Sequence, residues 1–150
     1  MGALARKVLS LGAREWRDLW RAQWALIVAQ RVVRSRPAGE LTTHGATPQQ
    51  APLEAADPRR GRRRAHAIGD AVQRAAKYGV FRPACLVRSI ALQRLLLADG
   101  IRGAVIRVGV KQSEAGMDAH AWVELHGEVI GDSVAHVRQY APLDDLSVVS

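Results

Sequence analysis

The sequence predicts an α+β domain, because a mainly helical N-terminal half is followed by segments in which apolar and polar residues alternate. Three observations support this prediction. Residues 84–97 are apolar around most of a helix circumference, residues 104–110 and 119–125 change to a period of two, and His126-Gly127 is a tight-turn signal. A helix followed by an antiparallel hairpin is typical of the α+β class.

Composition limits the kinds of protein that this chain can be. A length of 150 residues suits one domain. With 48% apolar and 24% charged residues the composition is globular, which excludes wholesale disorder. The single cysteine excludes an internal disulfide and a multi-cysteine zinc cage, and it suits a reducing cytoplasm. The longest uncharged apolar run, residues 24–29, is far shorter than the ~20 residues that span a bilayer.

Residues 1–34 are the first predicted unit, a helical region rich in Ala, Leu, Arg and Gln. Trp16, Trp20 and Trp24 recur every four residues and therefore lie along one helix face. We expect this row to dock the helix on the rest of the protein. Binding of a partner, and contact of this basic helix with an anionic membrane surface, are the alternative interpretations.

Residues 35–64 are predicted to be a linker, because Pro and Gly interrupt them and they end in the basic run 59–64. Residues 1–64 hold 13 basic and 5 acidic side chains, whereas residues 65–150 hold 9 of each, so the net charge of +8 lies in the N-terminal part. The basic run can attract an acidic partner by long-range steering. A non-enzymatic nucleic-acid-binding protein is the alternative, although one Phe and two Tyr are too few for a stacking platform.

Residues 65–150 are predicted to form a neutral domain around one buried helix. Residues 65–78 have helical spacing, and a second helix begins near Ala84, where Pro83 fits a first-turn position. Gly100 fits a left-handed C-terminal cap at the end of this second helix. Strands are expected at residues 104–110, 119–125 and 128–131.

Three side chains of this domain have the chemistry of a cysteine nucleophile with its base. Cys85 lies in the first turn of the buried helix, where the helix dipole and unpaired N–H groups favour a thiolate. His120 alternates with apolar residues on a predicted strand, so it projects from the face opposite the core. Asp132 follows the next strand across the turn, within reach of His120, where a carboxylate can orient the imidazole.

Each of these residues also has a simpler interpretation. Cys85 can be a small buried hydrophobe, His120 a surface histidine, and Asp132 a turn residue that caps local N–H groups. A metal site built from His120, His126, His136 and Asp132 is a further alternative, but no HExxH or His-x-His spacing supports it, so no metal is expected. His126 and His136 are the alternative bases. No Gly-rich phosphate loop is present, and no cofactor is expected.

Two motifs resemble those of a known family. The stretches 82–92, RPACLVRSIAL, and 119–124, AHAWVE, are similar to the signature of the lasso-peptide leader peptidases. That family belongs to the transglutaminase-like branch of the papain-type cysteine proteases. The resemblance covers about residues 65–145. It implies a transglutaminase-like fold with a central helix packed on a small antiparallel sheet, here with an N-terminal helical extension.

The resemblance also implies the activity and its partners. Cys85 is then the nucleophile, His120 the general base and Asp132 the orienting carboxylate of a cysteine peptidase. The implied substrate is a ribosomally made precursor peptide, whose leader segment is removed before an ATP-dependent lasso cyclase closes the core peptide. Residues 1–64 are too short for the winged-helix domain that binds the leader in many members, so that protein is expected to be a separate chain.

The oxyanion site and the substrate cleft are less fully specified. The Cys85 backbone N–H is expected to supply one oxyanion donor, and papain-type enzymes add a side-chain donor from just upstream. Tyr78 and Arg82 are the nearby polar candidates, with Tyr78 preferred, because Gln73 is twelve residues away. Trp122 is expected to line the cleft, with packing against the sheet edge or the first helix as its alternative. A thiol-dependent acyl transferase that cross-links amides is the alternative activity for the same catalytic residues.

Overall fold

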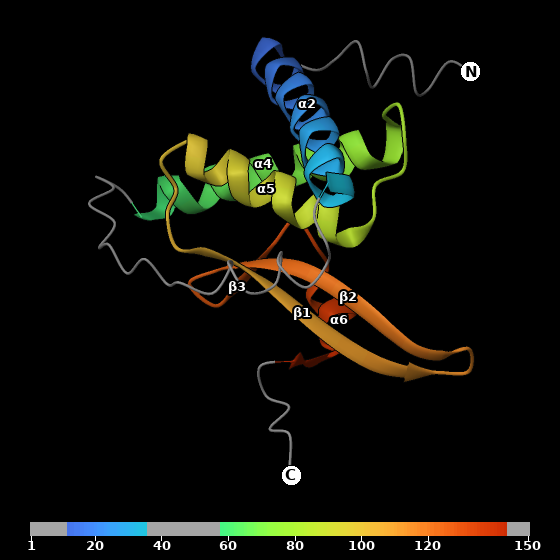
Figure 1. The fold of residues 1–150 in the computed structure, drawn as a ribbon. Coiled ribbons are helices and arrows are strands. Elements are labelled where there is room, and N and C mark those ends of the chain that lie inside the picture. Colours follow the sequence, from blue (N-terminus) through green and yellow to red (C-terminus); the bar gives the residue numbers. More distant parts are fainter. Residues whose placement is uncertain (1–11, 36–57, 144–150) are drawn as a thin grey trace, which may run out of the picture.

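The computed structural model describes residues 12–35 and 58–143. In this part of the chain, three long helices lie on one face of an antiparallel sheet, which confirms the predicted α+β class (Figure 1). The helices are α2 (Ala13–Ser35), α4 (Pro58–Tyr78) and α5 (Cys85–Ala98). They are followed by β1 (Ala104–Ser113), β2 (Gly116–Leu125), β3 (Glu128–Ile130), the short helix α6 (Val134–Val137) and β4 (Ala141–Pro142).

The sheet has the order β3-β2-β1-β4, and each neighbouring pair is antiparallel. The hairpin of β1 and β2 pairs Ala104 with Leu125, so the two predicted strands form adjacent partners. The turn before β3 has a φ of 51° at His126 and 81° at Gly127, as a two-residue hairpin turn with two left-handed positions requires. Sequence analysis missed α6 and β4, because elements of four and two residues are too short to show a period.

Helix α5 is the centre of the fold, as its apolar circumference predicts. It contacts α2, α4, β1 and β2, and it buries Val87, Ile90, Ala91, Leu92 and Leu96. Its C-terminus has a Schellman arrangement, in which Gly100 N–H donates to Leu97 O at 3.0 Å and Ile101 N–H donates to Leu96 O at 2.9 Å. The φ of +78° at Gly100 confirms the predicted cap. The prediction that Pro83 lies in the first turn was wrong, because Ala84 is the N-cap and Pro83 precedes it, two residues before the first helical residue.

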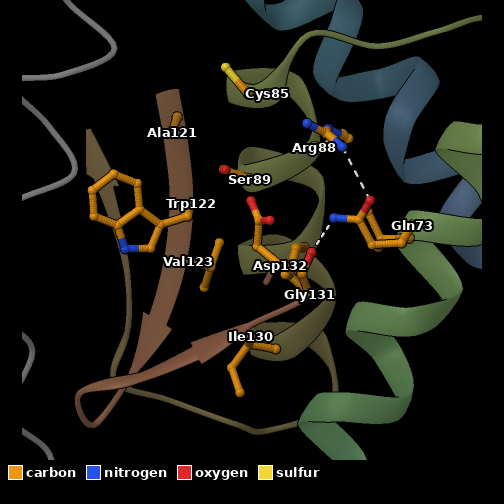
Figure 2. Close-up of a pocket in the computed structure, with 12 residues that line it drawn as sticks. Gln73, Cys85, Arg88, Ser89, Ala121, Trp122, Val123, Ile130, Gly131 and Asp132 are labelled. Atoms are coloured by element: carbon orange, nitrogen blue, oxygen red, sulfur yellow. Dashed lines mark hydrogen bonds between the residues drawn. The ribbon is translucent and has the colours of Figure 1, made fainter. Parts of the chain in front are cut away.

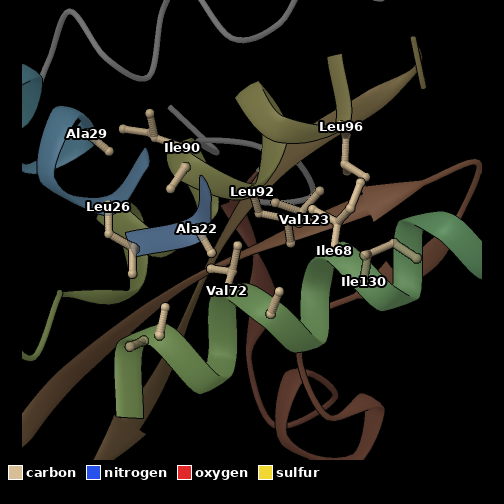
Figure 3. Close-up of a cluster of buried hydrophobic side chains, with 14 of the residues drawn as sticks. Ala22, Leu26, Ala29, Ile68, Val72, Ile90, Leu92, Leu96, Val123 and Ile130 are labelled. Atoms are coloured by element: carbon tan, nitrogen blue, oxygen red, sulfur yellow. The ribbon is translucent and has the colours of Figure 1, made fainter. Parts of the chain in front are cut away.

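The row of tryptophans on α2 does not dock the helix, so that prediction was wrong. The buried positions of α2 are Asp18, Ala22, Leu26 and Ala29, which recur at helical spacing on a different face. Figure 3 shows Ala22, Leu26 and Ala29 in the shared core. The small side chains at 22 and 29 let α2 approach α4 and α5 closely. Trp20 and Trp24, on the outward face, are each 69% exposed.

The basic run 59–64 is not the end of a linker, because it forms the first two turns of α4. Arg64 donates hydrogen bonds to both carboxylate oxygens of Asp18 on α2, and its Nε donates to Asp99 Oδ2 at 2.8 Å. Arg21 Nη2 donates to the other oxygen of Asp99 at 2.5 Å. This ionic cluster joins three helices, so α2 and residues 58–64 belong to the same folded unit as the rest of the described chain.

Both carboxylates of this cluster have lowered pKa values. The hydrogen bond from Arg64 is the main cause that lowers the pKa of Asp18. Burial alone would raise the pKa of Asp99, but the hydrogen bonds from Arg21 and Arg64 outweigh it and lower that pKa. The cluster therefore favours the charged carboxylates, and it stabilises the fold wherever they are ionised.

Some of the predicted organisation lies outside the described residues, namely residues 1–11 of the helical region and 36–57 of the linker. Among the helices that are described, none combines the length and the apolar character needed to cross a membrane.

Candidate active site

Cys85 is the first residue of α5, and the structure places it as the sequence predicts. The N-cap Ala84 has an extended backbone and provides no side-chain hydrogen bond to the helix end. The first N–H that the helix itself satisfies is that of Arg88, which donates to Ala84 O at 3.1 Å. Among the described residues the helix offers no acceptor to the N–H groups of its first turn, so these groups can bind a negatively charged oxygen. The thiol of Cys85 is half-buried and forms no disulfide.

His120 and Asp132 form a hydrogen-bonded pair. Strand β3 ends at Ile130, and the chain turns at Gly131, which has a φ of +69°. This turn brings Asp132 Oδ2 to 2.7 Å from His120 Nε2, while Oδ1 accepts the Ser133 N–H at 2.7 Å. A carboxylate accepts hydrogen bonds only, so Nε2 of a neutral His120 carries the proton and Nδ1 is the basic nitrogen.

Aromatic rings hold His120 in place on the sheet face opposite α5. Its ring centroid lies 4.7 Å from that of His136, 5.1 Å from that of Tyr140 and 6.2 Å from that of Trp122. His120 is buried, and it is therefore not the surface histidine of the simpler interpretation. Its ring has few orientations available while it stays bonded to Asp132.

Cys85 and Asp132 line one small cavity between α5 and β2. Its volume is about 10 Å³, near the lower limit for one water molecule. Ala121 and Trp122 form its wall on β2, and Figure 2 shows the Asp132 carboxylate directed toward the end of α5 that carries Cys85. His120 is not among the residues that line this cavity, and within the described residues no hydrogen bond joins it to the Cys85 thiol. Catalytic hydrogen bonds of this kind often tighten only when substrate binds.

Gln73 is the residue of this site that sequence analysis set aside. The chain folds back between α4 and α5, so Gln73 lies beside the start of α5 and lines the cavity of Cys85. Its Nε2 donates to Gly131 O, and its Oε1 accepts Arg88 Nη1 at 3.1 Å (Figure 2). Gln73 thus connects α4, the helix of Cys85 and the turn that precedes Asp132. No sequence pattern identified Gln73, because it lies near Cys85 and Gly131 only as a result of how α4 and α5 fold back on each other.

The other candidates are distributed around this centre. Tyr78 is 63% exposed at the end of α4 and does not line the cavity of Cys85. Trp122 lines that cavity and packs with Val137 and Tyr140, so its buried neighbours among the described residues are α6 and the residue before β4 and not the first helix. His126 lies in the β2–β3 turn. In the described ranges, no group of three or more His, Cys, Asp or Glu side chains is arranged to hold a metal ion.

A thiol at a helix start and a hydrogen-bonded His–Asp pair are groups that thiol-dependent enzymes use, and here Asp132 is the member of that pair that lines the cavity of Cys85. The chain belongs to the transglutaminase-like superfamily, whose family model matches residues 11–145. Members of this superfamily are typically cysteine-dependent proteases or acyltransferases. No curated protein and no solved structure matches the chain. The family match begins before α2, in agreement with the packing of that helix in the core.

Proposed function

We propose that the protein is a cysteine peptidase that removes the leader segment from a ribosomally made lasso-peptide precursor. The observation that carries the proposal is the hydrogen bond between His120 and Asp132 beside the cavity that Cys85 lines. The superfamily supports a thiol-dependent peptidase or acyltransferase. The motifs at 82–92 and 119–124 support the leader peptide as the substrate, through their resemblance to leader peptidases.

In the proposed reaction, Nδ1 of His120 takes the proton of the Cys85 thiol, and the thiolate attacks the carbonyl carbon at the leader–core junction. The oxygen of the tetrahedral intermediate accepts hydrogen bonds from the N–H groups at the start of α5. His120 then gives its proton to the leaving amine of the core peptide, and the leader remains as a thioester on Cys85. Water activated by His120 hydrolyses this thioester. Asp132 stabilises the imidazolium that forms in each step.

Gln73 is a better candidate than Tyr78 for the side-chain oxyanion donor. The Gln73 amide carries two N–H groups, and one of them donates to Gly131 O. The second N–H belongs to a residue that lines the cavity of Cys85. Tyr78 is largely exposed and lines other hollows of the surface.

The proposal is tested by mass spectrometry of a precursor peptide incubated with the enzyme, with and without the leader-binding protein. We expect hydrolysis at one junction, its loss in Cys85→Ala, and a loss nearly as large in His120→Ala, because members of a triad act as a unit. The control is His126→Ala, which removes an exposed histidine of the β2–β3 turn. Cleavage that persists in purified Cys85→Ala would overturn the assignment.

Acyl transfer to an amine is the second candidate, because the superfamily contains acyltransferases as well as proteases. The same thioester would then react with an amine instead of water. The same mass spectra decide between the two activities. A Cys85-dependent leader fragment whose mass is that of the leader acid plus the amine minus water identifies a transferase, whereas two fragments whose masses sum to precursor plus water identify the peptidase.

We further propose that the separate leader-binding protein docks on the outward face of α2, and that a lasso cyclase then consumes the freed core peptide. Exposed Trp20 and Trp24 support this docking face. Trp20 also lines a hollow of about 220 Å³, together with Trp16, Leu19 and Val80. Large apolar surface of this kind is typical of protein interfaces.

The double variant Trp20→Ala/Trp24→Ala tests this docking face. We expect it to retain the fold, because side chains that are 69% exposed contribute little to the core. Its affinity for the leader-binding protein, measured by titration calorimetry, should fall by about tenfold or more. The matched control is Leu97→Ala, which removes an exposed apolar side chain from α5. Equal affinity of the double variant and the wild type would contradict the proposal.

A further inference from the structure

An open hollow lies between the C-terminal end of α4 and the start of α5. Its volume is about 650 Å³, within the range of about 300–1,000 Å³ that is usual for ligand sites. Four cationic side chains line it: Arg74, Lys77, Arg82 and Arg88. Among the described residues no carboxylate side chain lines it, so the potential inside it is positive.

The cations of this hollow are less neutralised than the buried arginine of the ionic cluster. Arg64 has two carboxylate partners. In the hollow, Arg74 faces Glu15 at 3.6 Å, with both side chains about half exposed. The Lys77 ammonium lies 5.2 Å from the ring centroid of Tyr78 and forms no described ion pair. The hollow therefore keeps unpaired positive charge that an anionic ligand can neutralise.

The net charge of the chain conceals this local segregation. Residues 65–150 are neutral as a whole, with 9 basic and 9 acidic side chains. Four of those basic side chains line this one hollow, whereas none of the described acidic ones does. A surface that only needs solubility intersperses the two signs, so the segregation points to recognition of negative charge.

The hollow adjoins the cavity of Cys85, because Gln73 and Arg88 line both. Figure 2 shows the Arg88 guanidinium beside Cys85, held by its hydrogen bond to Gln73. The Nε of Arg88 is buried without a hydrogen-bond partner among the described residues. Arg88 therefore has unused donor capacity at the boundary between the hollow and the cavity of Cys85.

We propose that this hollow binds carboxylate side chains of the substrate peptide, close to the bond that Cys85 attacks. The proposal deepens the peptidase function above and rests on it. A peptide fits better than a nucleic acid, because Tyr78 alone among the described lining residues is aromatic, and base stacking needs several such rings. The arginines can bind carboxylates through two parallel hydrogen bonds, which Lys77 cannot.

The first test measures binding to the Cys85→Ala protein by fluorescence anisotropy. The probes are a short oligoglutamate peptide with an uncharged fluorophore, its oligoglutamine counterpart, and a single-stranded oligonucleotide. We expect oligoglutamate to bind most tightly, and Lys77→Gln/Arg82→Gln to weaken it by about tenfold, since each exposed charge pair contributes up to about fivefold. The matched control is Arg94→Gln/Arg102→Gln, which removes two exposed charges outside the hollow.

Equal binding of the two peptides, equal losses in both double variants, or a preference for the oligonucleotide would each overturn the proposal. The second test compares kcat/KM for precursor peptides whose acidic residues near the junction are replaced one by one with Asn or Gln. The proposal is supported if these replacements lower kcat/KM for the wild-type enzyme but leave kcat/KM unchanged for the Lys77→Gln/Arg82→Gln variant. Cysteine-dependent cleavage that ignores these replacements leaves the peptidase intact and overturns the hollow as its acid-binding site.

The two proposals can fail separately. If the Cys85→Ala protein prefers oligoglutamate through Lys77 and Arg82, but wild type cleaves no precursor, the peptidase assignment fails and the hollow stands as an acid-binding site. Its ligand is then a carboxylate-bearing peptide that the protein does not cleave, and the proposal that the bound peptide is a substrate is overturned.

Discussion

The replacement Leu26→Ala tests whether α2 is part of the same folding unit as the rest of the described chain or a separate helical unit, as the sequence predicts. The Leu26 side chain is completely buried in the shared core. Removing such a side chain costs its transfer free energy and leaves a cavity, together about 3 kcal/mol. That is a large part of the ~5–15 kcal/mol by which domains are usually stable, so the variant should unfold at a clearly lower urea concentration.

The assay is urea unfolding followed by circular dichroism, with Leu97→Ala on α5 as the matched control. Leu97 is 60% exposed, so the same chemical change there should cost less than about 1 kcal/mol. If the two variants share one unfolding midpoint, or if Leu26→Ala melts in two steps, α2 is not a cooperative part of this domain. The inference from the packing of Ala22, Leu26 and Ala29 would then be refuted.

Two further predictions concern the ionic cluster and the turn beside the site. Asp18 and Asp99 have pKa values below the ordinary 3.8, so their stabilisation is complete above that pH and is lost as the pH falls through the lower folded-state values. Arg64→Met should therefore cost most at neutral pH, and its difference in unfolding free energy from wild type should shrink below about pH 4; a difference that stays constant with pH contradicts this. Gly131→Ala should lower stability by about 1–2 kcal/mol, because φ is +69° there and the new Cβ would lie 2.9 Å from Leu92 Cδ2. The kcat of the folded Gly131→Ala protein should also be lower than that of wild type, because the change at the turn displaces Asp132. An unchanged kcat under conditions where the variant is fully folded would contradict this link between the turn and activity.

The residues of the candidate site differ in how far sequence could locate them. Cys85 follows from a local helix start, and the His120–Asp132 contact follows from strand period and one turn, because a hairpin places residues at predictable offsets. Gln73 could not be found in this way. Its position depends on how two helices fold back on each other, and helical spacing does not report the angle or register of that packing.

The sequence by itself determined the α+β class, the buried central helix with its Gly100 cap, and the β1–β2–β3 hairpins. These features depend on local periodicity and backbone preference, which a short window of residues contains.

Only the tertiary structure decided which face of α2 is buried. Periodicity shows that Trp16, Trp20 and Trp24 share a face, but both faces of that helix carry apolar side chains, and close approach to α4 and α5 favours the one with Ala22 and Ala29. The helical state of the basic run 59–64 also depends on tertiary structure, because the carboxylate partners of Arg64 are Asp18 on α2 and Asp99 at the end of α5. Ion pairs and side-chain packing between segments far apart in the sequence depend on how those segments are arranged in space, and a local sequence pattern does not contain that information.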